Sequence, residues 1–334
     1  MVNCYVAKGS LLAQVPSTLG PASLGDAVWI DLISPSKEEE EAVEALLGVG
    51  VPTPEEMREV QGSSQIYREG AASIMTIRVL SVSASPTPVL VAATFILTQE
   101  RLVTLRYSDP TPFKTFVKRA METPGQFTSS YRVMCGLLEV IVDRAAELLE
   151  GVGDELDQIS AELFGRKQDG SWDGAGTDLQ GILVKIGRNG DLASRARESL
   201  HSIARVVPVL QREQTAHASK PTATQAVDLP ATQAETITQD TKSLMDHAAY
   251  LTNNVQFLLD SALGLINIQQ NAIIKIFSVA AVLFLPPTLI ASVYGMNFEH
   301  IPELKWHLGY PFALTCMVGS ALVPYWYFKK RGWL

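Results

Sequence analysis

Oxygen-bearing side chains follow directly on a long apolar stretch near the end of the chain. Asn297, Glu299 and Glu303 lie in the segment YGMNFEHIPELKW, which comes after an uncharged run. Carboxylates raise the local concentration of cations, and an amide oxygen accepts hydrogen bonds from the water around an ion. Mg²⁺ suits such a site because it prefers oxygen ligands and sheds its water reluctantly. The pattern predicts the outer mouth of a cation pathway, whereas Asn297 taken alone is also typical of a helix end.

Two uncharged apolar segments flank this loop and predict two membrane-spanning helices. They run over residues 276–296 and 310–328. About 20 apolar residues cross a bilayer as a helix, and neither segment shows the polar face that a soluble helix would carry. Aromatic residues at the ends of the segments, such as Trp306, are typical of the membrane interface.

The flanks of these segments predict their orientation. A basic tail, residues 329–334, follows the second segment directly, so that end is expected in the cytoplasm. With two spans the large N-terminal region is then also cytoplasmic, and the loop at 297–309 faces outside. The first 30 residues show no secretory signal. Three widely spaced cysteines are expected to be free thiols in a reducing compartment: Cys4, Cys135 and Cys316.

Residues 1–125 are predicted to form an α/β domain. Ser36 and Glu39 have the spacing of a capping box, which indicates a helix start. The acidic run 38–41 is either a metal site or, in our interpretation, a solvated first turn that the helix dipole favours. Runs rich in β-branched residues, separated by turn residues, predict strands; they are residues 28–32, 72–82, 89–97 and 101–106.

Residues 126–235 are predicted to form a helical hairpin and a connector. The patterns over 131–164 and 178–212 indicate two long helices. The Gly-rich segment 165–176 between them lacks the ending of a phosphate-binding loop, and we interpret it as the turn. The Ala-, Thr- and Pro-rich segment 215–232 is expected to be irregular.

A single long helix is predicted over residues 236–296, because no proline or glycine-proline pair interrupts the chain between Leu265 and Leu285. From Asp240 to Tyr294 it would measure about 80 Å at 1.5 Å per residue. Its first half carries a heptad seam that favours a partner helix, or else packs within its own subunit. The seam consists of Leu244, Ala248, Leu251, Val255, Leu258, Ala262 and Leu265.

Two helices from one chain cannot enclose a pore, but an oligomer could place one helix from each copy around an axis. One heptad face of the first apolar segment mixes apolar and polar residues: Asn271, Ile274, Ser278, Ala281, Leu285 and Thr288. Such a lining can pass a hydrated ion and close by dewetting. The alternative is that this stripe only packs against another helix. Pro286 and Pro287 could kink the helix.

Several classes of protein are disfavoured by what the sequence lacks. A net charge of −8 argues against a nucleic-acid partner. Neither apolar segment holds an ionisable residue, which argues against a proton-coupled carrier or a redox protein. No metalloprotease, serine-hydrolase, phosphate-loop or dinucleotide motif supports an enzyme or an organic cofactor. A membrane-anchored coiled-coil scaffold or enzyme stays as the alternative, although a scaffold would not need Asn297.

The C-terminal part of the chain resembles a known family. YGMN after LPPT, followed by IPEL and the basic ending KKRGWL, is similar to the CorA family of divalent-cation transporters, and particularly to the magnesium channels of proteobacteria. The resemblance is close from Ile266 onward and weak in the N-terminal domain. It implies a homopentameric funnel in the bacterial inner membrane, in contact with lipid. The cytoplasmic α/β domain continues into a long stalk helix that lines the pore, with both termini cytoplasmic.

The resemblance also implies roles for individual residues. The family's selectivity motif falls on Gly295, Met296 and Asn297. Its pore-lining positions fall on Asn271, Ile274, Phe277, Ala281, Leu285 and Thr288, so Phe277 competes with Ser278 for one position. Mg²⁺ is then both the transported ion and a regulator bound between cytoplasmic domains, with Asp240 and Asp246 as candidate ligands. Loss of the regulatory ions would loosen the ring and favour opening.

The ion that passes is expected to be Mg²⁺, with Co²⁺ and Ni²⁺ as further ions. A zinc importer of the same superfamily is the alternative, because His300 and His307 in or next to the loop could bind softer metals. Exposed loop histidines are more often solvent contacts, and Met296 favours the magnesium branch.

Overall fold

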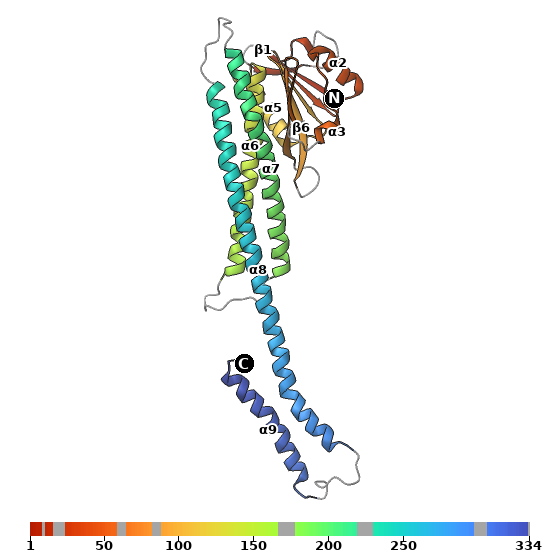
Figure 1. Ribbon diagram of the computed structural model, residues 1–334, viewed down its shortest axis with the longest axis vertical. Coiled ribbons are helices and arrows are strands. Elements are labelled where there is room, and N and C mark those ends of the chain that lie inside the picture. Colours follow the sequence, from red (N-terminus) through yellow and green to blue (C-terminus); the bar gives the residue numbers. More distant parts are fainter. Residues whose placement is uncertain are drawn as a thin grey trace. The chain divides into compact units, whose positions relative to one another are not determined.

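The computed structural model describes residues 1–8, 11–15, 24–58, 65–81, 88–165, 178–218, 230–296 and 306–332 (Figure 1). These residues form two compact units, which we describe separately. The first unit comprises Met1–Glu162 and Gln180–Leu259, and the second comprises Leu163–Leu179 and Asp260–Leu334.

A seven-stranded sheet forms the core of the first unit. In spatial order the strands are β2 (Leu11–Val15), β1 (Val2–Lys8), β3 (Trp29–Ile33), β7 (Leu102–Arg106), β6 (Val89–Leu97), β5 (Ala72–Ser81) and β4 (Ile66–Glu69). Only β3 and β7 run parallel, and they pair Asp31 with Thr104. The other neighbours are antiparallel. The four predicted strands are confirmed, with ends that differ by a residue at most.

Helices cover both faces of this sheet, which is why its central strands are almost uniformly apolar. On one face, α2 (Lys37–Leu47) and α3 (Pro54–Arg58) contribute Val43 and Met57 to a cluster with Ile30 and Val103. On the other face lies α5 (Thr111–Glu122), whose Phe116 ring meets the ring of Trp29 edge-on at 5.4 Å. Figure 1 shows the sheet between these helices.

The start of α2 follows the predicted capping box. Glu39 N donates to Ser36 Oγ, and Ser36 N donates to a Glu39 carboxylate oxygen at 2.8 Å. Glu38 and Glu40 share this first turn, where the helix dipole favours negative charge. The capping box and the place of these residues in the first turn support the interpretation of the acidic run as a helix start.

A buried ion pair joins the two parallel strands. Arg106 Nε and an Arg106 terminal nitrogen donate to the two oxygens of Asp31 at 3.1 and 2.8 Å, and Thr104 Oγ1 donates to the same carboxylate at 2.7 Å. The indole N–H of Trp29 donates to Thr104 Oγ1 at 2.9 Å. The Arg106 and Asp31 side chains are only 4% and 2% exposed. Asp31 and Arg106 are the only buried charged residues that the structure describes in this part of the sheet, and the network gives each of them a partner.

Three long helices complete the first unit: α6 (Ser130–Phe164), α7 (Leu179–Ala218) and the first part of α8 (Pro230–Tyr294). Leu251 of α8 lies over Gly153 of α6, and Val255 lies over Gly190 of α7. The heptad seam is thus buried inside its own chain, as Ala248 and Leu258 confirm with no exposed surface. Of the two interpretations of the seam, the structure supports packing within its own subunit, because the hairpin α6–α7 supplies the partner helices.

The connector between α7 and α8 is shorter than expected. Helix α7 continues to Ala218 and α8 begins at Pro230, where proline fits the first turn of a helix. The predicted turn at 165–176 lies outside the described residues except for Gly165. The predicted long helix is confirmed, because α8 is uninterrupted through Tyr294.

The second unit contains the last part of α8 and α9 (Gly309–Lys330). Among the described helices, one is apolar and long enough to cross a membrane by length and composition, over Gln233–Tyr294. Helix α9 coincides with the second predicted span, but tyrosine, tryptophan and proline lower its mean hydropathy. At the end of α9, Lys329, Lys330 and Arg331 lie over aromatic rings one turn earlier, at 5.4–5.9 Å.

Candidate cation pathway

The predicted pore-lining residues all lie on the exposed surface of α8. Leu285 is 67% exposed, Phe277 71% and Ile274 61%, although a soluble protein would bury such side chains. The remaining members of the set are also exposed: Asn271, Ser278, Ala281 and Thr288. Since Phe277 and Ser278 are both exposed, the structure does not choose between them.

The opposite side of α8 is the side that is covered within the second unit. Successive helical residues are turned by about 100°, so Val279, Leu283 and Ile290 face away from Ala281 and Leu285. Val279 is 7% exposed, and Leu283 and Ile290 are partly buried. Ala313 of α9 is 6% exposed, and Figure 1 shows α9 returning beside this part of α8. The stripe predicted to line a pore is therefore largely exposed within the second unit.

A hollow of about 470 Å³ lies on this free face. Only α8 contributes to it, with Ala281, Phe284, Leu285, Thr288, Leu289 and Ser292. Pro286 and Pro287 lie within this stretch, and proline removes the backbone donor that would close the preceding turn. The hollow holds three predicted pore positions, with one hydroxyl from Thr288 and one from Ser292 among apolar side chains.

Thr288 presents an acceptor on this face. Its hydroxyl donates to the backbone oxygen of Phe284 at 2.7 Å. A hydroxyl has one proton and two lone pairs, so its oxygen can still accept a hydrogen bond from the water around a cation.

Gly295 closes the last turn of α8. Its N–H donates to the oxygen of Ala291 at 2.9 Å, and a β-carbon at this position would approach the same oxygen to 3.0 Å. A side chain would therefore strain the turn that leads into the loop. Met296 follows and is 49% exposed. The predicted filter residue Asn297, the loop residues Glu299 and Glu303, and His300 lie outside the described residues, whereas His307 is described and exposed.

The two candidate regulatory ligands, Asp240 and Asp246, are exposed on α8. No metal-binding group of three side chains occurs in the described ranges, so any site there needs ligands from elsewhere. Asp240 contributes to raising the pKa of Glu139 on α6, whose main cause is burial, while Arg119 opposes the rise at 3.5 Å. Burial also raises the pKa of Asp143, again with Asp240 contributing.

Sequence reasoning missed this acidic neighbourhood. Glu139 and Asp143 lie one turn apart on α6, and this spacing could have predicted that they share one face of the helix. Their approach to Asp240 depends on how α6 and α8 pack, and the sequence alone does not contain that information.

The chain is similar to known proteins over most of its length. A family model described as CorA-like Mg²⁺ transporter protein matches residues 25–330. The chain is 32% identical to the magnesium transport protein CorA of Pasteurella multocida over 100% of both chains. It is 33% identical to the protein of the same name from Salmonella typhimurium over 93% of both.

A solved structure shares the fold. The complete structure of the CorA magnesium transporter from Methanocaldococcus jannaschii aligns with a TM-score of 0.72 and covers 100% of this chain and 99% of that chain. Its sequence is 18% identical, so this likeness concerns the architecture alone. The sheet domain, the long helix with an apolar segment and the C-terminal helix occur in both.

Proposed function

Because the chain belongs to the family of CorA-like Mg²⁺ transporter proteins, we propose that it conducts Mg²⁺ through a pore built from several copies of α8. The full-length relatives are magnesium transport proteins by name. The observation that carries the proposal is the free face of α8, where the predicted pore positions lie opposite the side covered within the unit. In an oligomer this face surrounds the axis and α9 lies outside it.

In a ring of subunits, neighbouring copies and lipid would cover the exposed apolar side chains of α8. Tyr250 is 62% and Phe257 58% exposed in the first unit, and Phe284 is 67% exposed in the second. Side chains of this size are normally covered by a partner or by lipid. We propose a homopentamer in the bacterial inner membrane, with α9 as a second span. The basic end of α9 then lies in the cytoplasm with the sheet domain.

Selection of the ion is assigned to the ring of Gly295, Met296 and Asn297 at the outer end of α8. Carboxamide oxygens there would bind the water shell of Mg²⁺ rather than the bare ion, and Glu299 and Glu303 would concentrate cations at the mouth. Co²⁺ and Ni²⁺ are proposed as further ions. The pathway closes by dewetting at bulky apolar positions such as Leu285.

Gating is assigned to cytoplasmic Mg²⁺ at subunit boundaries that include Asp240 or Asp246. Both carboxylates are exposed in a single chain and are therefore available to a neighbouring copy. Ions bound there would hold the closed ring together, and their loss would shift the population toward an open state.

The test is ion flux into liposomes that contain the purified protein, at fixed voltage, with Mg²⁺, Co²⁺, Ni²⁺ and Zn²⁺ compared. We expect Mg²⁺ flux to be abolished by Asn297→Ala. His307→Ala serves as the control, since it alters an exposed residue of the same region without touching the proposed filter. Unchanged flux in Asn297→Ala would refute the filter.

The same assay decides between magnesium and zinc. A zinc importer would carry Zn²⁺ faster than Mg²⁺, would respond to an imposed pH gradient, and would lose flux in His307→Ala. A purified protein that stays monomeric would refute the shared pore, because a single α8 cannot enclose one.

A further inference from the structure

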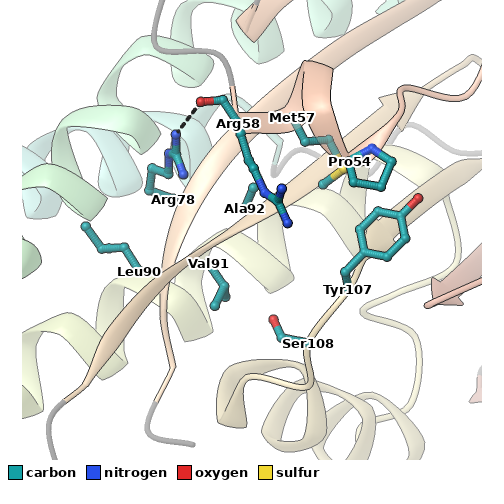
Figure 2. Close-up of a pocket in the computed structure, with 9 residues that line it drawn as sticks. All are labelled: Pro54, Met57, Arg58, Arg78, Leu90, Val91, Ala92, Tyr107 and Ser108. Carbon is teal, nitrogen blue, oxygen red and sulfur yellow. Dashed lines mark hydrogen bonds between the residues drawn. The ribbon is translucent and has the colours of Figure 1, made fainter.

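A pocket of about 240 Å³ lies in the sheet domain, far in sequence from the residues of the cation pathway. It is formed where β6 begins and β7 ends, beneath α3. Its lining consists of Pro54, Met57, Arg58, Arg78, Leu90, Val91, Ala92, Tyr107 and Ser108 (Figure 2). Ligands of α/β sheets commonly bind beyond the carboxyl end of a parallel strand, and Tyr107 and Ser108 follow that end of β7.

Two guanidinium groups give the pocket a positive charge. In Figure 2 the guanidinium of Arg58 points into the pocket, and that of Arg78 lies at its edge. A terminal nitrogen of Arg78 donates to the backbone oxygen of Arg58 at 3.2 Å, which holds the two residues together. No acidic residue lines the pocket, and neither arginine forms an ion pair with any residue that the structure describes. Within the described residues, neither guanidinium is therefore held in a direct ion pair.

Ser108 adds a buried hydroxyl without a partner. Its Oγ is inaccessible to solvent and makes no hydrogen bond within the described chain. Figure 2 shows this oxygen directed into the space between Val91 and Tyr107. A buried hydroxyl without a partner is unfavourable, so a side-chain rotation that brings Ser108 Oγ to an acceptor bound in the pocket would be favoured.

The remaining wall is apolar and aromatic. Met57, Leu90 and Val91 form one side, and the ring of Tyr107 forms another. The hydroxyl of Tyr107 donates to Glu40 at 3.2 Å, and partial burial together with Glu40 raises the pKa of Tyr107 to about 12. Tyr107 therefore stays protonated at neutral pH and carries no charge of its own, and the nearby carboxylates of Glu40 and Glu55 lie outside the lining of the pocket.

From these contacts we propose that the pocket binds a phosphoryl group, either as free phosphate or as the head of a small phosphorylated molecule. Guanidinium groups match the planar edges of phosphate with paired donors, and two of them balance a dianion. Ser108 supplies a third donor once its side chain rotates toward the ligand. A volume of about 240 Å³ is below that of a pocket for a drug-sized ligand, which excludes a bulky molecule. The apolar wall fits a small organic body on the phosphate.

The site is independent of the cation pathway, because every lining residue belongs to the first unit. Its occupation is a property of the sheet domain and does not require a working pore. Binding can therefore be measured on protein that conducts no ion, and the two proposals fail separately.

The experiment is calorimetric titration of the full-length protein in detergent, in magnesium-free and low-chloride buffer. The probes are inorganic phosphate, phenyl phosphate and phenol. We expect both phosphates to bind and phenol not to bind, and Arg58→Gln to weaken binding at least tenfold. Arg58 is exposed, so this variant should fold. Arg68→Gln is the matched control, since it removes an arginine of the same domain outside the pocket.

The outcomes separate the two sources of the phosphoryl group. Phenyl phosphate binding more tightly than inorganic phosphate supports a phosphorylated organic ligand, and equal affinity supports free phosphate. The proposal is overturned if neither phosphate binds, if phenol binds as tightly as phenyl phosphate, or if Arg58→Gln and Arg68→Gln change affinity equally. Ser108→Ala gives a second check that leaves the charge intact, with an expected loss of several-fold in affinity.

Discussion

The ion pair between Asp31 and Arg106 gives the sharpest prediction about stability. We consider Asp31→Ala, which removes a carboxylate whose side chain is 2% exposed. The change leaves Arg106, 4% exposed, with one carboxylate partner, Asp109, at 2.6 Å. It also removes the acceptor of the Thr104 hydroxyl. Arg106 therefore keeps only a partner that is 42% exposed, and the buried side of its guanidinium loses its acceptor.

The expected magnitude follows from burial. Removing one partner of a buried ion pair costs about 3–5 kcal/mol. The matched variant is Asp109→Ala, which removes another carboxylate from the same arginine. Asp109 is 42% exposed, and a pair of that exposure contributes about 0–1 kcal/mol. The two variants thus differ in burial while they share Arg106.

The assay uses Trp29 as a local reporter. Trp29 has no exposed surface, and its N–H donates to Thr104 inside the same network. With the other four of the five tryptophans changed to phenylalanine, fluorescence reports unfolding of the sheet in guanidinium. At a slope of about 4 kcal/mol per molar, Asp31→Ala should lower the midpoint by about 1 M. Asp109→Ala should lower it by at most about 0.25 M. Equal shifts in the two variants would refute the argument from burial.

Three further predictions concern α6 and α8. Gly136→Ala should lower the free energy of unfolding by about 1–3 kcal/mol, because its β-carbon would collide with phenylalanine rings. The control Gly151→Ala lies on the same helix, where a β-carbon meets no other atom, and should stabilise the protein by about 0.5–1 kcal/mol. Thermal unfolding measures both changes. Glu139→Gln should stabilise the protein at pH 7 but not below pH 4. Burial raises the pKa of Glu139 in the folded state, so wild-type stability falls as pH rises above the ordinary value of 4.5; midpoints from pH 3.5 to 8 test this. In a cysteine-free background, Leu285→Cys should let a charged thiol reagent block flux whereas Leu283→Cys should not, and equal block would contradict the assignment of faces.

Much of the fold could be predicted from the sequence because its signals are local. The capping box at Ser36 specifies a helix start within a few residues, and β5 and β6 are long enough to show β-branched runs between turn residues. The hairpin of β1 and β2 was not predicted. Its strands are of mixed composition, and pairing with the rest of the sheet stabilises them more than their own propensity does.

The helix face that carries the candidate pathway could also be assigned from the sequence, whereas its role as a pathway stays a prediction. A period of 3.6 residues places Ala281, Leu285 and Thr288 on one face whatever surrounds the helix. The sequence does not show which helix covers the heptad seam of α8. In the structure, Leu251 packs against α6 of its own chain. The proposed phosphoryl pocket could not be predicted from the sequence. Arg78 lies beside the residues that follow β7 only because of the register of the sheet.

The parallel pairing of β3 with β7 has a consequence for biosynthesis. Asp31 and Arg106 are 75 positions apart, so a ribosome must release a long stretch of nascent chain before the central strands can join. Until then the partner edge of β3 is open, and open edges invite aggregation. The whole sheet is nevertheless translated before the apolar part of α8, since β7 ends at Arg106 and α8 begins at Pro230. Delivery to the membrane can therefore follow, rather than precede, completion of the N-terminal domain.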